Sequence, residues 1–234
     1  MNHQKQTQIT APTPGFIFDL DGTLIDSVYP HVLAWMQAFD QFGIPVAGWR
    51  IHRRIGMSGD LFVRAIFREI GHPADDDLTD RIQHAHGDHF QLVKDQVRPL
   101  PGAKDLLETL TAFTVPWAIA TSGHIRSASH GLEMLGILNG PAPIVTRDLV
   151  KYAKPDPDLF LAAAVALDIP IATAFVIGDS VWDMFAAGRV HALPIGLRCG
   201  GNSETELRHA GAYRVFDDPA DMLDHLDELG VREA

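Results

Sequence analysis

Apolar residues follow two different patterns on either side of about residue 98. Between residues 28 and 97 they recur at the three- and four-residue spacing of amphipathic helices, without the alternation or density of a strand. Ser27 and Ser58 stand at positions suited to helix N-caps. We therefore expect helices at about 28–42, 59–70 and 74–93, and no strand among them.

Beyond the breaker segment 98–102, with two prolines and a glycine, short apolar strands alternate with helices. Such alternation is typical of βαβ units, whose right-handed crossovers build a parallel sheet covered by helices on both faces. The predicted fold is α/β, a doubly wound (Rossmann-like) parallel sheet core with a small inserted α-helical cap. The predicted strands are 16–18, 117–120, 144–145, 174–177, 193–197 and 213–215, and the predicted helices are 103–112, 126–135, 157–167, 181–188, 204–209 and 220–229.

Two units follow from this division of the chain. Residues 1–27 and 98–234 are expected to form the α/β core, and residues 28–97 the helical cap. A length of 234 residues is enough for one sizeable core and a smaller module. The first 15 residues are polar and have no apolar stretch of the kind found in signal peptides, so we expect no secretion signal.

Net charge, apolar content and cysteine content limit the kinds of partner and the cellular compartment that we expect for this chain. The formal net charge of −11 disfavours nucleic acid or an anionic membrane surface as a partner. The richest apolar run, at 160–167, is far shorter than the roughly 20 residues of a membrane span. Cys199 is the only cysteine, so no intrachain disulfide can form. A cytoplasmic protein is expected.

Two carboxylates end the first predicted strand. Asp19 and Asp21 are two residues apart, so a strand period would place both on one side, and Gly22 lets backbone N–H groups approach an anion. An isolated Asp-Gly pair would indicate only a turn. Two acids that converge at a strand end can also bind a hard cation, or one can attack phosphorus while the other transfers a proton.

Polar clusters also follow two later strands, namely Thr121-Ser122-Gly123 and Gly178-Asp179-Ser180. The carboxyl ends of parallel strands meet at one edge of the sheet, where ligands of such folds bind. We therefore expect these clusters to lie beside Asp19 and Asp21.

The whole series of motifs resembles the haloacid dehalogenase (HAD) superfamily, from about Phe16 to the C-terminus. The first signature, D-x-D-G-T after an apolar strand, matches Asp19 to Thr23, and the second matches Thr121. The third matches Lys154-Pro155 and the fourth matches Gly178 to Asp183. The resemblance is to the branch of phosphoglycolate phosphatases and β-phosphoglucomutases, in which a C1 cap is inserted where the helical stretch lies here.

The resemblance implies a role for each catalytic residue. Asp19 would be the nucleophile that forms an aspartyl-phosphate, and Asp21 the general acid, with a pKa raised from about 3.9 toward the working pH. Thr121 would donate to a phosphoryl oxygen, and Lys154 would neutralise the nucleophile and the transferring group.

The resemblance also implies a Mg²⁺ site. Asp19, Asp179 and the backbone carbonyl of Asp21 would hold the ion, with Asp183 as a further ligand or as a partner of a ligand. Phosphate or substrate would be bound by a separate set, Gly22, Thr23, Ser122, Gly123, Arg53 and Arg54. The two arginines, near the flexible segment 56–59, are expected to meet the non-reacting end of the substrate; an equal alternative is that they are merely solvated.

Three histidines of the cap, His84, His86 and His89, could suggest a transition-metal site. Only His86 and His89 could share a helix face, and no motif of established spacing is present. Exposed cap histidines are the expected interpretation.

The predicted function is a Mg²⁺-dependent phosphatase that hydrolyses a small phosphomonoester, resembling phosphoglycolate or a sugar phosphate, and works as a monomer or weak homodimer. One alternative is a β-phosphoglucomutase-like isomerase. A phosphonoacetaldehyde hydrolase would need a cap lysine, and Lys94, the only lysine of the insert, is close to the hinge. A third alternative, from another class, is a non-catalytic binding protein on the same scaffold.

Overall fold

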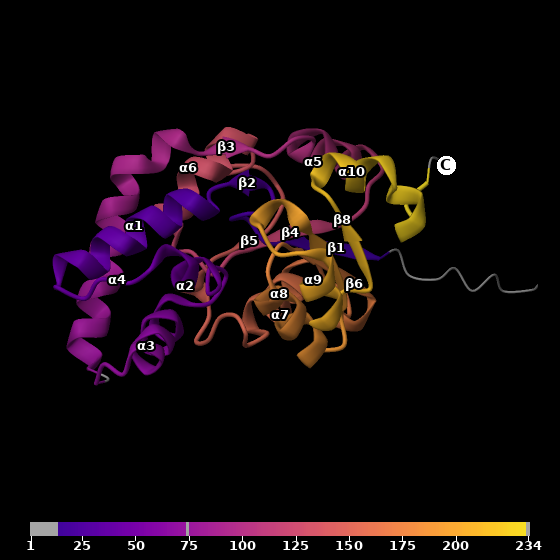
Figure 1. The fold of residues 1–234 in the computed structure, drawn as a ribbon. Coiled ribbons are helices and arrows are strands. Elements are labelled where there is room, and N and C mark those ends of the chain that lie inside the picture. The colour runs from indigo at the N-terminus through magenta and orange to yellow at the C-terminus, as the bar shows by residue number, and fades with distance from the viewer. Residues whose placement is uncertain (1–13, 74, 233–234) are drawn as a thin grey trace, which may run out of the picture.

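The computed structural model describes residues 14–73 and 75–232, so the polar lead-in expected at the N-terminus lies almost wholly outside the described residues. A helical unit containing α1 to α4 lies at one end of the molecule, and a sheet flanked by helices lies at the other (Figure 1).

The large sheet has six strands in the order β5-β4-β1-β6-β7-β8, and every neighbouring pair is parallel. Two short strands, β2 and β3, lie where the chain enters and leaves the helical unit, which is called the cap from here on. When the other six strands are numbered in chain order, their order in the sheet is 3-2-1-4-5-6. This is the order of a doubly wound fold, in which the strand order reverses beside the first strand. The predicted fold class is confirmed. The strands are β1 Gly15–Phe18, β4 Trp117–Ala120, β5 Ile144–Val145, β6 Ala174–Gly178, β7 Leu193–Leu197 and β8 Arg214–Phe216.

Helices cover both faces of the sheet because its strands are apolar on both sides. In β1, Phe16 and Phe18 pack on one face with α5, α6 and α10, whereas Ile17 packs on the other with α7 and α8. Short 3-10 turns join several elements, at Lys94–Gln96, Arg147–Leu149, Ile171–Thr173 and Arg198–Gly200. The helices are α5 Ala103–Ala112, α6 Ile125–Leu135, α7 Asp158–Ala166, α8 Val181–Arg189, α9 Glu204–His209 and α10 Pro219–Asp224.

The helical unit has an apolar cluster of its own, which includes Trp35, Phe39, Phe62 and Phe67. The three expected helices are present, and no strand occurs among the described residues between 28 and 97. A fourth helix, α2, was not predicted, because five residues are too few to show a helical period. The helices are α1 Val28–Gln41, α2 Gly48–His52, α3 Gly59–Ile70 and α4 Asp76–Val93.

The chain enters and leaves the helical unit through a small antiparallel sheet. β2, Ile25–Asp26, pairs with β3, Arg98–Pro99, in the segment that the sequence indicated only as a breaker. Proline is tolerated there because a two-residue edge strand needs few donors. The pairing holds both crossing points of the chain side by side.

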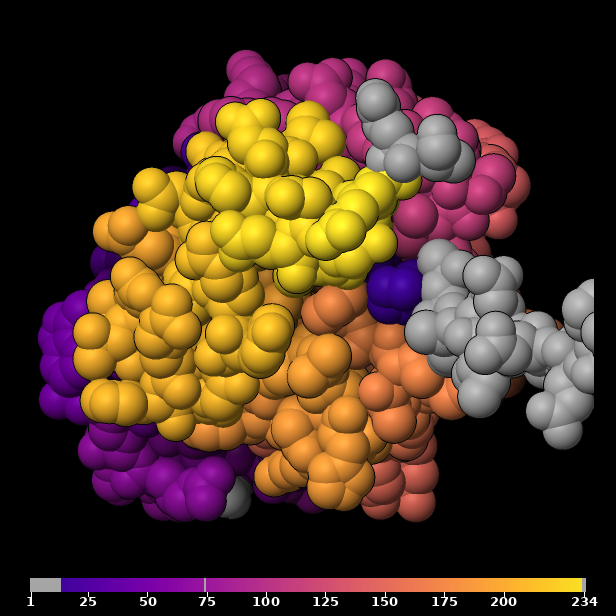
Figure 2. Space-filling model, turned by 90° about the vertical axis from the view of Figure 1, so that its right-hand side faces the viewer, coloured from indigo at the N-terminus to yellow at the C-terminus, as the bar shows by residue number. Residues whose placement is uncertain are grey.

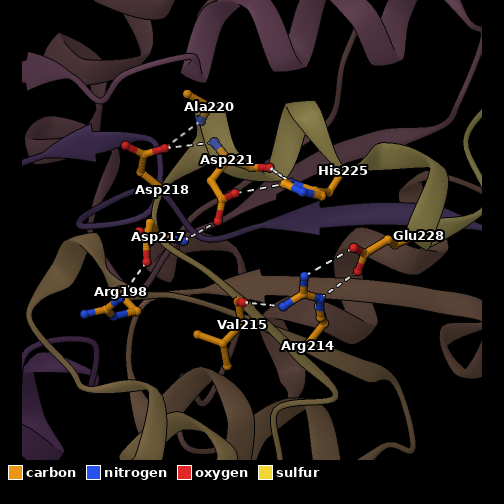
Figure 3. A network of polar contacts seen from close by, with 9 residues as sticks. All are labelled: Arg198, Arg214, Val215, Asp217, Asp218, Ala220, Asp221, His225 and Glu228. Atoms are coloured by element: carbon orange, nitrogen blue, oxygen red, sulfur yellow. Dashed lines mark hydrogen bonds and ion pairs between the residues drawn. The ribbon is translucent and has the colours of Figure 1, made fainter.

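The last predicted helix, 220–229, is divided in the structure. α10 ends at Asp224, and Leu226–Leu229 continues as a 3-10 turn. Figure 3 shows the contacts around this break: Asp218 accepts hydrogen bonds from the first backbone N–H groups of α10, and the His225 ring bonds the Asp221 carbonyl, 2.8 Å away.

The same region anchors β8, which begins one residue later than predicted. Arg214 forms a two-pronged ion pair with Glu228, and Arg198 pairs with Asp217 at 2.6 Å (Figure 3). The C-terminal segment thereby covers the face of the core remote from the cap, beside α5 (Figure 2). Among the described helices, none has the length and apolar character that a bilayer span requires.

Candidate active site

Asp19 and Asp179 meet at the carboxyl edge of the sheet, on the two strands that flank its reversal point. The backbone N–H of Asp19 extends the β1–β6 ladder by donating to the Ile177 carbonyl at 2.8 Å. Asp179 directly follows β6, and Asp183 lies in the first turn of α8. The three carboxylates each offer an oxygen within 4.8 Å of the others, and all three side chains are buried.

A fully buried ammonium group lies among these acids. Lys154 Nζ is 2.5 Å from Asp19 Oδ1 and 2.8 Å from Asp183 Oδ1. Burial would lower the pKa of Lys154, but Asp183 and Asp19 raise it overall, so the group stays protonated. These two carboxylates are the charged partners of the buried ammonium among the described residues. Lys151, the alternative by sequence, is exposed.

The cluster carries more negative charge than its one ammonium neutralises. Burial raises the pKa of Asp19 to about 7, an effect that Lys154 opposes and Asp183 reinforces. Burial, followed by Asp183 and Asp19, raises the pKa of Asp179 well above its ordinary value. Three ionised carboxylates beside one ammonium leave two negative charges, which a divalent cation would balance.

The surroundings of Asp179 fit a hard cation. Its Oδ1 accepts a hydrogen bond from the Thr23 hydroxyl at 3.0 Å. Its Oδ2 lies against Gly22 and Gly200, where a Cβ atom would come within 2.6 Å and 1.7 Å of it. Glycine at both positions therefore lets the backbone approach this oxygen more closely than any other residue would. Oxygen donors from Asp19 and Asp179 are of the kind that Mg²⁺ prefers.

Asp183 has a more internal set of contacts. Its Oδ1 pairs with Lys154, and its Oδ2 accepts from the Ser180 N–H at 3.1 Å and the Ser180 hydroxyl at 2.6 Å. The capping box at the start of α8 thus occupies Oδ2, and Lys154 occupies Oδ1. Of the two roles predicted for Asp183, the geometry favours support of Lys154 over direct contact with a metal.

Asp21 is held by residues that the sequence did not single out for a site. Its Oδ1 accepts from the Ser27 hydroxyl at 2.6 Å and lies 3.3 Å from His31 Nε2. Burial raises the pKa of Asp21, but the charge and hydrogen bond of His31, with the bond from Ser27, outweigh it and the pKa is lowered. This direction is opposite to the environment expected for a general acid.

His31 in turn contacts the cap helix α4, because its Nδ1 is 3.0 Å from His86 Nε2. His86 also stacks on Trp35, with ring centroids 3.9 Å apart, and burial followed by His31 lowers its pKa well below the ordinary value. The expectation of exposed cap histidines is therefore wrong for His86, although His84 is exposed. The sequence signal for these contacts was the four-residue spacing of His31 and Trp35, which places both side chains on one face of the predicted helix 28–42.

A cavity of about 580 Å³ lies between cap and core, with Asp19 and Asp21 in its lining. Thr121, Ser122 and Gly123 also line it, as their position after β4 predicts. The Gly123 N–H donates to the Thr121 hydroxyl oxygen at 3.0 Å, so the hydroxyl proton of Thr121 can go to a ligand.

Other predicted contacts to phosphate have different partners. The Ser122 hydroxyl donates to the Gly56 carbonyl of the cap at 3.1 Å. Gly22 and Thr23 do not line the cavity; the Gly22 N–H bonds the Ile25 carbonyl, and Thr23 binds Asp179. In the structure Thr23 holds the Asp179 side chain and Gly22 lies against it, so both residues position Asp179 and do not face an anion.

The two cap arginines also lie outside the cavity lining. Arg53 pairs with Glu206 of the core at 2.5 Å, and Arg54 pairs with Glu69 and bonds the Arg50 carbonyl. Their charges are satisfied by these acids, so the solvated or structural alternative describes them better than a role at the distant end of a substrate.

Comparison with known proteins places the chain among phosphate-processing enzymes. A model of the haloacid dehalogenase-like hydrolases matches residues 13–191. The chain is 30% identical over 233 residues to phosphoglycolate phosphatase of Rhodospirillum rubrum, covering 93% of this chain and 95% of that protein. It is 29% identical to validoxylamine A 7'-phosphate phosphatase of Streptomyces hygroscopicus, over 80% of this chain and 87% of the relative.

Similar proteins also include isomerases. The identity to β-phosphoglucomutase of Bacillus subtilis is 31%, over 70% of this chain and 74% of the relative. Among solved structures, a hydrolase from Pseudomonas syringae is 50% identical, with a TM-score of 0.90 over 92% of this chain and 99% of that one. The chain thus has similar proteins in both the hydrolase and the mutase group.

Proposed function

Since the chain belongs to the haloacid dehalogenase-like hydrolase family, we propose that it is a Mg²⁺-dependent phosphatase that hydrolyses a small phosphomonoester through an aspartyl-phosphate on Asp19. The observation that carries this proposal is the buried Asp19 carboxylate, which lines the cavity and is ion-paired with the fully buried Lys154. No other described carboxylate of the cavity has a lysine partner.

In the first step, an Asp19 carboxylate oxygen attacks phosphorus and the bond from phosphorus to the alcohol oxygen breaks. Lys154, which is paired with Asp19, and the Thr121 hydroxyl provide positive charge and a hydrogen bond for the phosphoryl oxygens. Asp21 gives its proton to the leaving alkoxide. A bound phosphoryl dianion between the two acids would raise the pKa of Asp21, which is lowered in the free protein.

In the second step, water attacks the phosphorus of the aspartyl-phosphate and Asp21 takes the proton of that water. Inorganic phosphate leaves and the Asp19 carboxylate is restored. His31 and Ser27 hold Asp21 Oδ1 through both steps, so the second oxygen of Asp21 is the one available for proton transfer.

Asp19 and Asp179 would hold the metal ion, together with the backbone carbonyl of Asp21 as predicted. When bound, Mg²⁺ would neutralise the excess charge of the buried acids and the charge that develops on the phosphoryl oxygens. Asp183 would keep Lys154 in place. A small phosphorylated metabolite, a cytoplasmic location and a monomer or weak homodimer remain predictions of the sequence.

A mutase is the second candidate, favoured by the similarity to β-phosphoglucomutases and by a cavity between cap and core that could hold a sugar. A mutase would also use Asp19 and Asp21, but it would transfer the phosphoryl group back to a sugar hydroxyl instead of to water. A phosphonoacetaldehyde hydrolase is disfavoured, since no lysine is present among the described lining residues and Lys94 lies where the chain leaves the cap. The complete set of acids argues against a scaffold without catalysis.

The test is phosphate release from a panel of phosphomonoesters by the full chain, with Mg²⁺ and with EDTA. We expect release that EDTA abolishes and that falls at least about 1000-fold in Asp19→Asn. Glucose 6-phosphate formed from the 1-phosphate, without phosphate release, would instead support the mutase. Release that persists in EDTA or in Asp19→Asn would overturn the proposal.

A further inference from the structure

The upper wall of the cavity, formed mostly by the cap, is rich in apolar side chains. Trp35 packs between two rings of this wall, with its centroid 4.3 Å from that of Phe62 and 3.9 Å from that of His86. Ile55 and Met57 extend the apolar surface from the loop before α3. A ligand above Asp19 therefore meets aromatic and aliphatic groups, which favour a partner with an apolar face.

The polar groups of this wall are mainly uncharged. Gln83 and Gln91 present amides from α4, and the pKa of His86 is lowered well below its ordinary value by burial, so its imidazole is neutral. The amide of Gln83 has only a long contact, 3.5 Å, to the Thr79 carbonyl. Such groups can donate to and accept from hydroxyls.

Positive charge is scarce in the wall. Among the described lining residues the only lysine or arginine is Arg126, which pairs with Asp88 at 2.9 Å and is largely exposed. His124 contacts Asp148 at 2.6 Å, so any charge on it is matched locally. Asp80 adds a negative charge to the same lining. Arg53 and Arg54, the cations that the sequence suggested for this purpose, lie elsewhere.

From this distribution we propose that the substrate is a phosphomonoester of an uncharged, polyhydroxylated alcohol, and that the cavity discriminates against esters whose alcohol part carries a second negative charge. The inference rests on the proposed phosphatase function and adds the class of substrate to it. A carboxylate at the distant end of the substrate would lose water and gain no cation, in a lining to which Asp80 already adds negative charge.

The size of the cavity agrees with this class. A volume of about 580 Å³ lies within the range of pockets, roughly 300–1,000 Å³, that enclose molecules of many heavy atoms. A two-carbon acid such as glycolate would fill only a small part of this volume. The volume has room for a sugar or polyol chain on the phosphoryl group.

A matched pair of substrates tests the inference directly. Sorbitol 6-phosphate and 6-phosphogluconate differ at one carbon, which is a CH₂OH group in the first and a carboxylate in the second. With the full chain and Mg²⁺, we expect kcat/KM to be at least about tenfold higher for sorbitol 6-phosphate. A ratio of one, or a ratio in favour of 6-phosphogluconate or phosphoglycolate, would overturn the inference.

A charge placed in the wall should change this preference. Gln83→Lys introduces a cation opposite the distant end of the substrate, whereas Gln83→Met has a similar length and no charge. We expect the relative kcat/KM for 6-phosphogluconate to be several-fold higher in Gln83→Lys than in Gln83→Met, which loses the same amide and gains no charge. An equal change in both variants would show that charge does not set the preference.

Binding separates the failure of this inference from the failure of the proposed function. Calorimetric titration of the two esters into the Asp19→Asn protein needs no turnover, and we expect sorbitol 6-phosphate to bind at least about tenfold more tightly. Tighter binding of 6-phosphogluconate would refute the substrate class even in a protein that releases phosphate. Absence of phosphate release with the expected order of binding would refute only the phosphatase.

Discussion

The floor and the upper wall of the cavity differ in the kind of residue that they contain. Asp19 lines the floor, and the buried charges of Asp179, Asp183 and Lys154 lie beside it in a region almost without solvent. The wall has aromatic rings and neutral amides, and its one arginine is paired at the surface. This difference indicates that residues of the core carry out phosphoryl transfer and that residues of the cap determine which alcohol part of the substrate is accepted. Substitutions in the floor should therefore change turnover or stability strongly, and those in the cap weakly.

The largest effect on turnover among the acids around Asp19 is expected from Asp21→Asn. An amide cannot give or take the proton, so phosphate release should fall about 100- to 10,000-fold. Mg²⁺ binding, measured by calorimetric titration, should change little, because the side chain of Asp21 is turned to Ser27 and His31. An equal loss of turnover and metal binding would contradict a role in proton transfer.

Lys154→Met tests whether the floor depends on its one buried cation. Removal of the ammonium leaves the carboxylates of Asp19 and Asp183 without a cation, and the free energy of unfolding should fall by about 3–5 kcal/mol. Urea unfolding without metal measures the change. Lys151→Met at an exposed site is the control and should change stability by less than about 0.5 kcal/mol. Equal stability of both variants would contradict the role of Lys154.

The metal should stabilise the protein more at high pH. The folded-state pKa of Asp19, about 7, and that of Asp179 are raised above the ordinary value of 3.8, so the folded state holds protons that the unfolded chain has lost. Without metal, stability therefore falls as pH rises through this window. Mg²⁺ replaces those protons, so the rise of Tm on adding it should be larger at about pH 8 than at about pH 5. An equal rise at both values would contradict a site built on these acids.

A smaller effect is expected from the cap residue that positions Asp21 through His31. His86→Leu removes the contact with His31, worth about 1 kcal/mol, and kcat should fall about fivefold with little change in KM. His86→Gln keeps a nitrogen donor near His31 and should recover most of kcat. A loss that is the same in both variants would indicate packing, not the hydrogen bond, as the reason.

The smallest effect is expected at the rim of the cap. Arg53→Ala breaks a partly exposed ion pair with Glu206, so stability should fall by at most about 1 kcal/mol. Because Arg53 lies outside the cavity lining, kcat/KM for a neutral ester should stay within about twofold of the original protein. A tenfold rise of KM would restore the substrate role that the sequence suggested for this arginine.

The difference between floor and wall also explains what the sequence could predict. Asp19, Thr121 and Asp179 follow parallel strands, and the carboxyl ends of such strands meet at one edge of the sheet for any loop conformation. The strand boundaries and the sheet class were predictable from apolar runs for the same reason. The role of Lys154 beside Asp19 followed only from its place in the third motif, and its burial was not predicted.

The wall was not predictable in this way. His31 and His86 meet because α1 packs against α4, and a helix period alone does not give the rotation or distance between two helices. Arg53 and Arg54 looked available in the sequence because Glu206 and Glu69, which pair with them, lie 153 and 15 positions away. The lowered pKa of Asp21 depends on the same cap contacts and could not be foreseen from the motif.

The central claim is that Asp19 is the nucleophile that carries the phosphoryl group. Acid quenching during turnover of a phosphomonoester, followed by mass spectrometry of the peptide that contains Asp19, tests it most directly. The account predicts a phosphorylated Asp19 that appears within one turnover and is absent in Asp19→Asn. Continued release of phosphate with Asp19 unmodified, or the phosphoryl group on another residue, would contradict it.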